Sequence, residues 1–427
     1  MKNLNENELQ KTLRFIDLFA GGGGLSEGFI RAGFTPIAHV ESDQAACFTL
    51  KTRTAYHWLK ASGQLDCYDD YLHGRITRGG LYDIIPQKQI PSVINAEIGK
   101  NTLAEIFGEI DKLLQGENLD LIIGGPPCQA YSLPGRSRDK NGMKGDKRNY
   151  LYVYYAEFLE RYKPKYFVFE NVRGLLSAKD ENDLLYLDLM KELFKEKGYE
   201  TVEKVLSAND YGVPQNRKRV FLIGNRVAKV DFFPLPEKWI FDINVGEVLK
   251  DLPSIKAGEG SIAPHKLKEY SGDYLNDTKI RSGNKWVTLH IARPHNIQDL
   301  EIYRIAINQW NEHHKRLNYR DLPDRLKTHK NETSFTDRFK VVAADLPMSH
   351  TVVAHISKDG HYYIHPDIDQ NRSITPREAA RLQTFPDDYF FESVSEKTGR
   401  TTAFRQIGNA VPVLFAQKIA EKLWEIW

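Results

Sequence analysis

The sequence has 427 residues, of which 41% are hydrophobic, enough for one large domain and a smaller one. Lysine and arginine number 59 against 57 aspartates and glutamates, and the net charge of +2 excludes a uniformly basic or acidic surface. The three cysteines form neither a disulfide set nor a metal knuckle, so neither a disulfide scaffold nor a metal site is expected. Without an apolar signal core or a run of about 18 apolar residues, the chain is expected to be cytoplasmic, with no membrane partner.

Residues 13–224 alternate short apolar runs with helix-length segments. The apolar runs are "LRFIDLF", "TPIAHV", "LDLIIGG" and "KYFVFEN". This alternation predicts an α/β fold with a doubly wound, mostly parallel sheet. "ETVEKVL" and "RVFLIGN" follow each other without a helix between them, so the sheet is expected to finish with an antiparallel pair.

The alternation is lost from about residue 229. We therefore predict a catalytic domain over 10–228, to which 373–427 return, and a smaller, irregular domain over 229–372. In that second domain, "AHISKDGHYYIH" carries an Asp-Gly turn between two strand-like arms and predicts a hairpin. In "SITPREAARLQTF", Thr375, Pro376 and Glu378 predict a capped helix start, and a last helix is expected from Pro412 onward.

The stretch "FIDLFAGGGGLSEGF" predicts a strand, a glycine turn and a helix start. It does not fit the dinucleotide fingerprint G-x-G-x-x-G, because Ser26 or Glu27 would occupy the third glycine position. A ligand could still approach this backbone closely, and Glu41, at the end of the next strand, could hold ribose hydroxyls. The alternative is an ordinary tight turn with a solvated glutamate.

A single cysteine, Cys128, follows the strand "LDLIIGG" and two prolines. Open parallel sheets bind ligands at the carboxyl ends of their strands, so this cysteine is expected at an exposed rim, as a nucleophile. A lone cysteine is otherwise more often a core residue, which is what we expect of Cys47 amid helical apolar residues. For Cys67 the sequence suggests no partner.

The strand "KYFVFEN" ends in Glu170 and Asn171, beside the expected position of the cysteine. A glutamate there suits proton donation to a ring nitrogen, although the pair could instead belong to a helix N-cap supplied by Asn171. In "QNRKR", Arg217 and Arg219 alternate and should point to one face. Two arginines beside a nucleophile and an acid suggest an anionic or carbonyl-bearing substrate.

Six motifs, in order, resemble those of DNA cytosine-C5 methyltransferases of the bacterial restriction-modification type: "FAGGGGLSEGF", "GGPPCQAYS", "FENVRGLL", "QNRKR", "TPREAARLQTFP" and "FRQIGNAVP". The resemblance covers the chain except the middle module and the stretch 51–94. Three other readings stay open at this point: an RNA-directed branch of the same family, a catalytically inactive DNA-binding relative and a nicotinamide oxidoreductase. Retention of the four catalytic candidates argues against the inactive relative.

The resemblance implies a Rossmann-like methyltransferase that moves a methyl group from S-adenosylmethionine to carbon-5 of a flipped-out cytosine. It implies that Cys128 adds to carbon-6, Glu170 contacts ring nitrogen 3, Arg219 holds the carbonyl oxygen and Arg217 supports the thiolate region. The residues it implies around the cofactor are Phe19, Gly21, Gly22, Gly24, Glu41, Glu97, Ile98, Pro127, Asn409 and Val411. Glu97 departs from the aspartate usual in the family.

The implied partner is double-stranded DNA, held between the catalytic domain and the 229–372 target-recognition domain. The loop 129–149 holds six Lys or Arg and two Asp, and is expected to cover DNA phosphates. Expected DNA contacts are Ser132, Arg136 and Arg148, with Arg293 as a guanine reader or, equally, a surface arginine. A separately encoded restriction endonuclease and a monomeric state are also expected.

Overall fold

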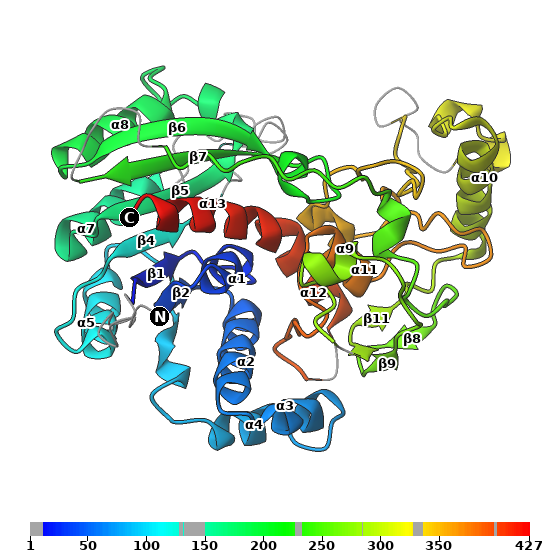
Figure 1. The fold of residues 1–427 in the computed structure, drawn as a ribbon. Helices are drawn as coiled ribbons and strands as arrows, with labels where there is room; N and C mark the ends of the chain where they lie inside the picture. The colour runs from blue at the N-terminus through cyan, green and yellow to red at the C-terminus, as the bar shows by residue number, and fades with distance from the viewer. Residues whose placement is uncertain are drawn as a thin grey trace, which may run out of the picture.

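The computed structural model describes residues 12–127, 131, 150–226, 233–283, 285–327, 336–396 and 399–427. At its centre is a seven-stranded sheet with the order β3-β2-β1-β4-β5-β7-β6 (Figure 1). The strands are β1 (Arg14–Leu18), β2 (Thr35–Glu41), β3 (Val93–Asn95), β4 (Leu121–Gly124), β5 (Tyr166–Val172), β6 (Glu200–Ser207) and β7 (Lys218–Asn225). Strands β1 to β5 are parallel, whereas β7 runs antiparallel to β5 and β6, so the predicted mostly parallel sheet and its antiparallel pair are confirmed.

Helices cover both faces of this sheet, because successive strand residues point to opposite sides. On one face, Phe15 and Ile223 pack with α1 (Gly24–Arg31) and α13 (Val413–Glu425). On the other, Ile16 and Phe167 pack with α5 (Leu103–Leu114), α7 (Leu151–Tyr162) and α8 (Tyr186–Glu196). The fold is therefore doubly wound, as predicted.

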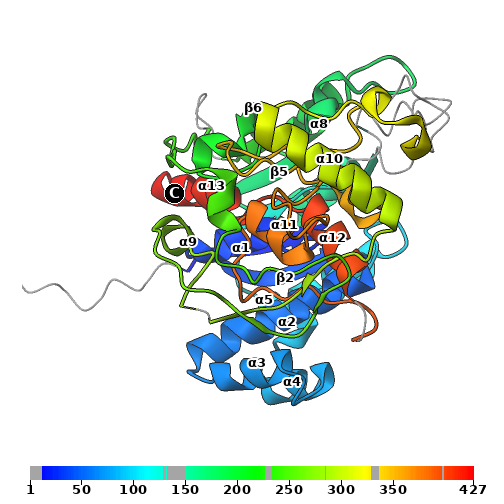
Figure 2. The same ribbon diagram turned by 90° about the vertical axis from the view of Figure 1, so that its right-hand side faces the viewer.

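A helical extension projects beyond the sheet on the side of β2 and β3 (Figures 1 and 2). It consists of α2 (Gln44–Ala61), α3 (Leu65–Leu72) and α4 (Arg78–Ile84). Its small core includes Tyr68, Tyr71 and Leu81, and the Tyr71 hydroxyl donates to Glu392 Oε1 over 2.5 Å. The extension is thus tied to the C-terminal part of the chain.

Residues 233–372 form the irregular region on the opposite side, where α10 is outermost (Figure 1). Its described α-helices are the one-turn α9 (Tyr274–Asp277) and the longer α10 (Ile297–His313). Two short antiparallel pairs join β8 (Gly260–Ser261) with β11 (His290–Ile291) and β9 (His265–Lys266) with β10 (Trp286–Val287). Single turns of 3-10 helix recur along the chain: η1 (Ile90–Ser92), η3 (Arg173–Ser177), η4 (Ala208–Tyr211), η5 (Val245–Val248), η6 (Tyr319–Asp321), η7 (Asp324–Leu326) and η8 (Ala354–Ser357).

The predicted hairpin in "AHISKDGHYYIH" is wrong. Its first arm forms the 3-10 turn η8, and its second arm bonds elsewhere, because the Ile364 N–H donates to the Lys340 carbonyl over 2.8 Å. Gly360 has a φ of 84°, but the hydrogen-bonded turn starts at this residue, because the Tyr363 N–H donates to the Gly360 carbonyl over 2.8 Å. A strand-like pattern of apolar residues shows that a segment can be extended, but it does not show which other segment the strand pairs with.

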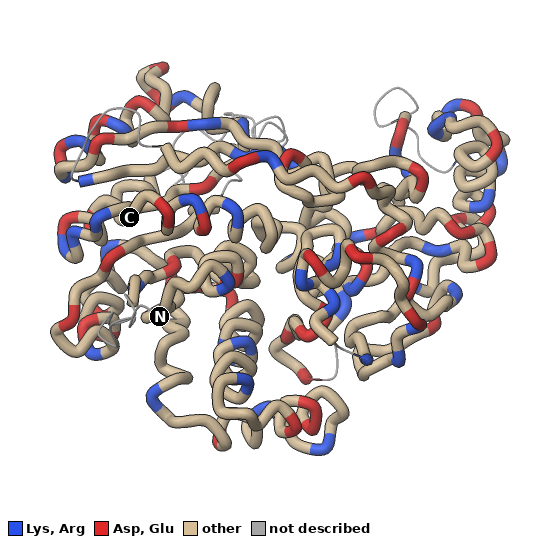
Figure 3. Tube along the Cα trace, in the orientation of Figure 1, with Lys and Arg blue, Asp and Glu red and all other residues tan. Residues whose placement is uncertain are grey.

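The chain then returns to the sheet through α11 (Pro376–Leu382), α12 (Arg400–Asn409) and α13. The predicted capping box is confirmed, because Thr375 Oγ1 accepts from the Glu378 N–H and the Glu378 carboxylate accepts from the Thr375 N–H. Acidic and basic residues are interspersed along both regions (Figure 3). No helix within the described ranges combines the length and the apolar character needed to cross a bilayer.

Candidate active site

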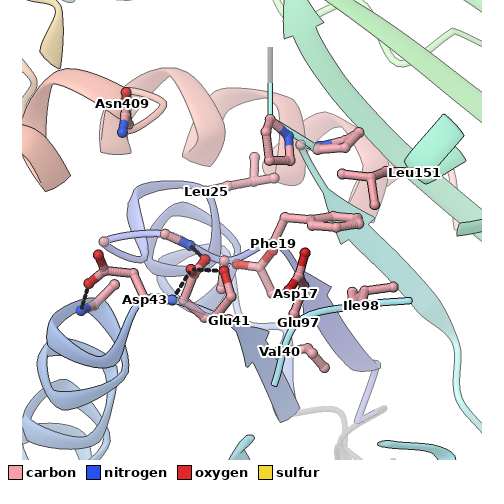
Figure 4. Close-up of a pocket in the computed structure, with 18 of the residues that line it drawn as sticks. Asp17, Phe19, Leu25, Val40, Glu41, Asp43, Glu97, Ile98, Leu151 and Asn409 are labelled. Atoms are coloured by element: carbon pink, nitrogen blue, oxygen red, sulfur yellow. Dashed lines mark hydrogen bonds between the residues drawn. The ribbon is translucent and has the colours of Figure 1, made fainter. Parts of the chain in front are cut away.

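One cavity of about 990 Å³ lies at the carboxyl ends of β1, β2, β4 and β5. Every residue predicted for the cofactor lines it, and so do Glu170 and Arg219. Figure 4 shows Phe19, Glu41 and Ile98 among the lining residues. Leu151, Tyr154 and Gln406 also line it, although sequence reasoning missed them. These three residues lie on helices α7 and α12, where apolar spacing alone does not distinguish a cavity wall from core.

The glycine turn after β1 forms one wall of the cavity. Gly21 and Gly23 have φ of 54° and 77°, a left-handed backbone that other residues adopt at a cost. At Gly24 a Cβ would lie only 2.2 Å from the Val411 carbonyl oxygen, so the chain has no room for a side chain there. The glycines therefore let the C-terminal segment and a ligand approach the same backbone.

Glu41 lies at the end of β2, next to the turn. Its Oε2 accepts from the Gly21 N–H and its Oε1 from the Asp43 N–H, each over 2.7 Å. The carboxylate is thus held at the cavity edge, where it can accept hydrogen bonds from hydroxyl groups (Figure 4). Asp17 of β1 also lines the cavity. Its pKa is raised well above the ordinary value, mainly by burial and to a smaller extent by the negative charge of the nearby Glu41.

The segment after β3 provides the opposite wall. The side chain of Asn95 donates to the carbonyls of Glu41 and Ser42, each over 3.1 Å, which ties this segment to the end of β2. Thr102 Oγ1 donates to the Glu97 carbonyl over 2.5 Å. These bonds place Glu97 and the buried Ile98 along the cavity, an arrangement suited to a flat apolar ring with polar edges.

Glu170 and Arg219 form the polar end of the same cavity. Arg219 Nε donates to Glu170 Oε1 over 2.8 Å, and both side chains are only 12% exposed. Burial raises the pKa of Glu170, and the charges of Arg219 and Arg217 oppose that shift. A Cβ on Gly125 would lie 2.7 Å from Glu170 Oε2, so the glycine leaves space for this carboxyl.

Asn171 connects β5 to the proline turn that precedes the predicted nucleophile. It is buried, and its Nδ2 donates to the Pro126 carbonyl over 3.2 Å. The N-cap alternative for Asn171 is wrong, because β5 continues to Val172 and η3 has no side-chain cap. Pro127, the last described residue before the predicted nucleophile, lines the cavity.

Arg217 and Arg219 differ in their surroundings. Arg217 is fully buried, and its guanidinium donates to the Val352 carbonyl over 2.7 Å and to the Ala410 carbonyl over 2.7 Å. It does not line the cavity, so its contacts indicate a role in joining segments, and its part in catalysis stays a prediction.

Arg293, the predicted guanine reader, donates to the Lys358 and Ile356 carbonyls over 3.0 and 2.7 Å. Its guanidinium also lies 5.4 Å from the centre of the Phe404 ring. The guanidinium is thus bonded to the backbone of the protein and is half-buried, unlike a free surface arginine, and base reading by Arg293 stays a prediction.

Four predicted residues, Cys128, Ser132, Arg136 and Arg148, lie outside the described residues. Of the other cysteines, Cys47 is buried, and burial raises the pKa of its thiol to about 12, as fits the predicted core residue. Cys67 is half-buried on α3. Neither lines the cavity.

Comparison with known proteins gives one consistent family. The family model described as C-5 cytosine-specific DNA methylase matches residues 13–63 and 89–425, and the unmatched interval contains α3 and α4. The type II methyltransferase M.Bpa9945I of Bacillus paralicheniformis is 42% identical over 96% of this chain and 98% of its own length. M.DdeI of Desulfomicrobium norvegicum, also a type II methyltransferase, is 31% identical over 96% of this chain and 88% of its own length.

Solved structures agree on the fold. A structure from E. coli, described as a proposed DNA modification methyltransferase encoded within a prophage, has a TM-score of 0.63 and 24% identity. The match covers 97% of this chain and 99% of the other. At this level of identity the likeness supports the α/β architecture only.

Proposed function

Because the chain belongs to the family of C-5 cytosine-specific DNA methylases, we propose that its cavity brings S-adenosylmethionine and a flipped-out cytosine together. The chain is a DNA (cytosine-5-)-methyltransferase, and its relatives are type II methyltransferases. One observation supports the proposed arrangement most strongly. The glycine turn with Glu41 and the pair of Glu170 with Arg219 line a single continuous cavity.

The residues present fit S-adenosylmethionine. The glycine turn leaves open backbone for the methionine portion, Glu41 offers a carboxylate to ribose hydroxyls, and Ile98 offers an apolar surface to the adenine. When bound, the cofactor supplies an electrophilic methyl group. The protein's task is then to make carbon-5 of cytosine nucleophilic at the other end of the cavity.

In the proposed mechanism, the Cys128 thiolate adds to carbon-6 of the ring and shifts an electron pair toward carbon-5. Glu170, whose pKa is raised by burial, donates a proton or a hydrogen bond to ring nitrogen 3 and so stabilises the adduct. Arg219 orients Glu170 and faces the carbonyl oxygen of the base. After carbon-5 has taken the methyl group, loss of its proton and of the thiolate restores the ring.

This chemistry requires a cytosine outside the helical stack, and unstacking costs about a few kcal/mol. Double-stranded DNA is therefore the proposed substrate, with residues 229–372 as the target-recognition domain. Segment 311–340 of this domain has eight Lys or Arg and five acidic residues. If sequence choice lies in the domain, a chimera carrying another enzyme's domain should methylate the donor's site, and a chimera that keeps the original site would refute the assignment.

The experiment that tests the mechanism is covalent trapping with DNA containing 5-fluorocytosine at the target site. A proton can leave carbon-5 as a cation, but fluorine cannot. Elimination of the Cys128 thiolate should therefore stall after methyl transfer. A complex that survives denaturing electrophoresis is expected only with S-adenosylmethionine present. Cys128→Ala should abolish the complex, whereas Cys47→Ala and Cys67→Ala should not; an adduct on either of these cysteines would contradict the mechanism.

Two glutamate variants test the two ends of the cavity separately. Glu170→Gln should lower kcat by about 10²- to 10⁴-fold with little change in KM for S-adenosylmethionine. Glu41→Gln should mainly raise that KM. If both variants change the same constant, the proposed division of the cavity is wrong.

We further propose that the enzyme acts in the cytoplasm and is a monomer. A separately encoded restriction endonuclease is the proposed partner enzyme. Light scattering of the purified protein tests the monomer, and a dimer would contradict it. Cleavage of unmethylated DNA by extracts of the source cells tests the endonuclease.

A further inference from the structure

We infer that Tyr389 is a positioning residue for the cofactor, because its hydroxyl holds the glycine turn that forms one wall of the cavity. This inference rests on the proposed function, since it assigns to Tyr389 an effect on the binding of S-adenosylmethionine. Tyr389 does not line the cavity itself. Its effect is therefore exerted through the backbone of the turn.

The turn needs an external restraint because four glycines follow one another, from Gly21 to Gly24. Glycine backbone has more conformational freedom than that of any other residue, so the turn is not fixed by its own sequence. The Tyr389 hydroxyl donates to the Gly22 carbonyl over 2.8 Å. At the other end of the same peptide unit, the Gly23 N–H donates to the Ala20 carbonyl over 3.0 Å.

Both polar groups of that peptide unit are therefore bonded, and its orientation is fixed. The neighbouring Gly21 N–H is held by Glu41. A Cβ on Gly23 would lie 2.4 Å from the Tyr389 hydroxyl oxygen, so this oxygen also fills the space beside the turn. Without the hydroxyl, the Gly22 carbonyl would be left without this donor in a buried place, and the turn would be free to rotate away from the ligand.

Tyr389 is itself immobilised, which a positioning residue requires. It is 1% exposed, and its ring lies 4.8 Å from the Phe385 ring and 5.1 Å from the Phe391 ring, centre to centre. The Arg53 guanidinium lies 4.8 Å from its ring centre on another side. Its own carbonyl accepts from Arg377 Nη2 over 2.8 Å.

Arg377 also reaches the irregular region. Its Nε donates to the Thr288 carbonyl and its Nη2 to Thr288 Oγ1, each over 3.0 Å. Tyr389 is therefore fixed between the cofactor turn and the segment that carries β10 and β11. These contacts hold the hydroxyl at hydrogen-bond distance from the Gly22 carbonyl.

The test is Tyr389→Phe, which keeps the ring and removes only the hydroxyl. We expect the Kd for S-adenosylhomocysteine, measured by calorimetry, and the KM for S-adenosylmethionine to rise by about five- to thirty-fold. The kcat at saturating cofactor should stay within about twofold, because the base end of the cavity is not touched. This split distinguishes positioning from a general loss of structure, which would lower kcat as well.

The matched control is Tyr199→Phe. Tyr199 is also 1% exposed, and its hydroxyl donates to a backbone carbonyl over 2.8 Å, but that carbonyl belongs to Pro164, which does not line the cavity. This variant should bind S-adenosylhomocysteine as the wild type does. An unchanged Kd in Tyr389→Phe, or equal weakening in both variants, would overturn the inference. A wild-type protein that does not bind S-adenosylhomocysteine would overturn the proposed function as well.

Discussion

The sheet and the segment 233–396, which comprises the irregular region 233–372 and the return through α11, satisfy their buried polar groups by different means. In the sheet, each strand bonds to its neighbours through a backbone ladder, and the faces are apolar. In the segment 233–396, long buried side chains take over this role, and Arg372, Arg377 and Arg381 are all fully buried. A buried carbonyl without a strand partner needs another donor, and the five N–H groups of arginine supply several at once.

Because of this difference, the two regions are stabilised by different kinds of interaction. The sheet owes its stability to many small apolar contacts, none of which is decisive. The segment 233–396 depends on a few charged and titratable groups that are buried and paired, such as Arg372 with Glu378 over 2.7 Å. Removing or protonating one member of such a set leaves an unpaired group in the interior.

Acidification should therefore destabilise the irregular region more than the sheet, and this is the largest effect we expect. Burial lowers the pKa of four histidines there, to about 4 for His290, His350 and His365 and about 3 for His295. Because the unfolded chain binds protons at these sites below about pH 6.5, stability is lost as the pH falls from 6.5 toward 4. From pH 7 to 5 this amounts to roughly 1–2 kcal/mol for each histidine.

The sheet provides the internal comparison. Its buried His39 has a pKa lowered to about 4, but Asp17 has a raised pKa and takes up a proton in the folded state, so the two effects oppose each other. Hydrogen exchange measured by mass spectrometry at pH 7 and 5, corrected for intrinsic rates, should show protection lost first in peptides from 285–372. Equal loss in peptides from β1 and β2 would count against this explanation.

Arg381→Met should produce the next largest effect. Arg381 pairs with Asp251 and with Asp387, whose Oδ2 lies 2.7 Å from Nη2, and all three groups are fully buried. Without the guanidinium the carboxylates lose their main partner, so the free energy of unfolding should fall by about 3–5 kcal/mol. The variant Arg325→Met, which breaks an exposed pair with Glu301, should leave urea unfolding unchanged; a similar loss in both variants would refute the argument.

Ile223→Val should produce the smallest effect. Ile223 is fully buried in β7, and the substitution removes one methylene without changing the backbone ladder. The cost should be about 0.5–1.5 kcal/mol, seen as a small shift of the urea midpoint at constant slope. A cost as large as that of Arg381→Met would erase the proposed difference between the two regions.

The same difference explains what could be predicted from the sequence. Strand periodicity located the sheet, and the motifs located the cavity residues from Phe19 to Val411, because both are local patterns. The bonds of Arg217 could not be predicted in this way, since its partner Val352 is 135 positions distant and the bond is to a backbone carbonyl. Any residue can supply a carbonyl, so no residue type marks the acceptor.

The failed hairpin has the same cause, because its arms bond to segments that the turn does not bring together. The alternative role of Asn171, a cap, was also local, whereas its side-chain amide donates to the carbonyl of Pro126, which follows β4. In the irregular region the local signal was too weak to identify such partners.

The contact between the glycine turn and the C-terminal segment has a consequence for synthesis on the ribosome. Tyr389 and Gly22 are 367 positions apart, and α1 packs against α13, the last helix described. During translation, the apolar residues Leu25 and Phe29 of α1 therefore cannot pack against α13 until that helix has emerged from the ribosome. Proteins with such exposed apolar surfaces depend on chaperones before completion. The cavity is therefore incomplete until translation has passed Val411, which forms part of its wall.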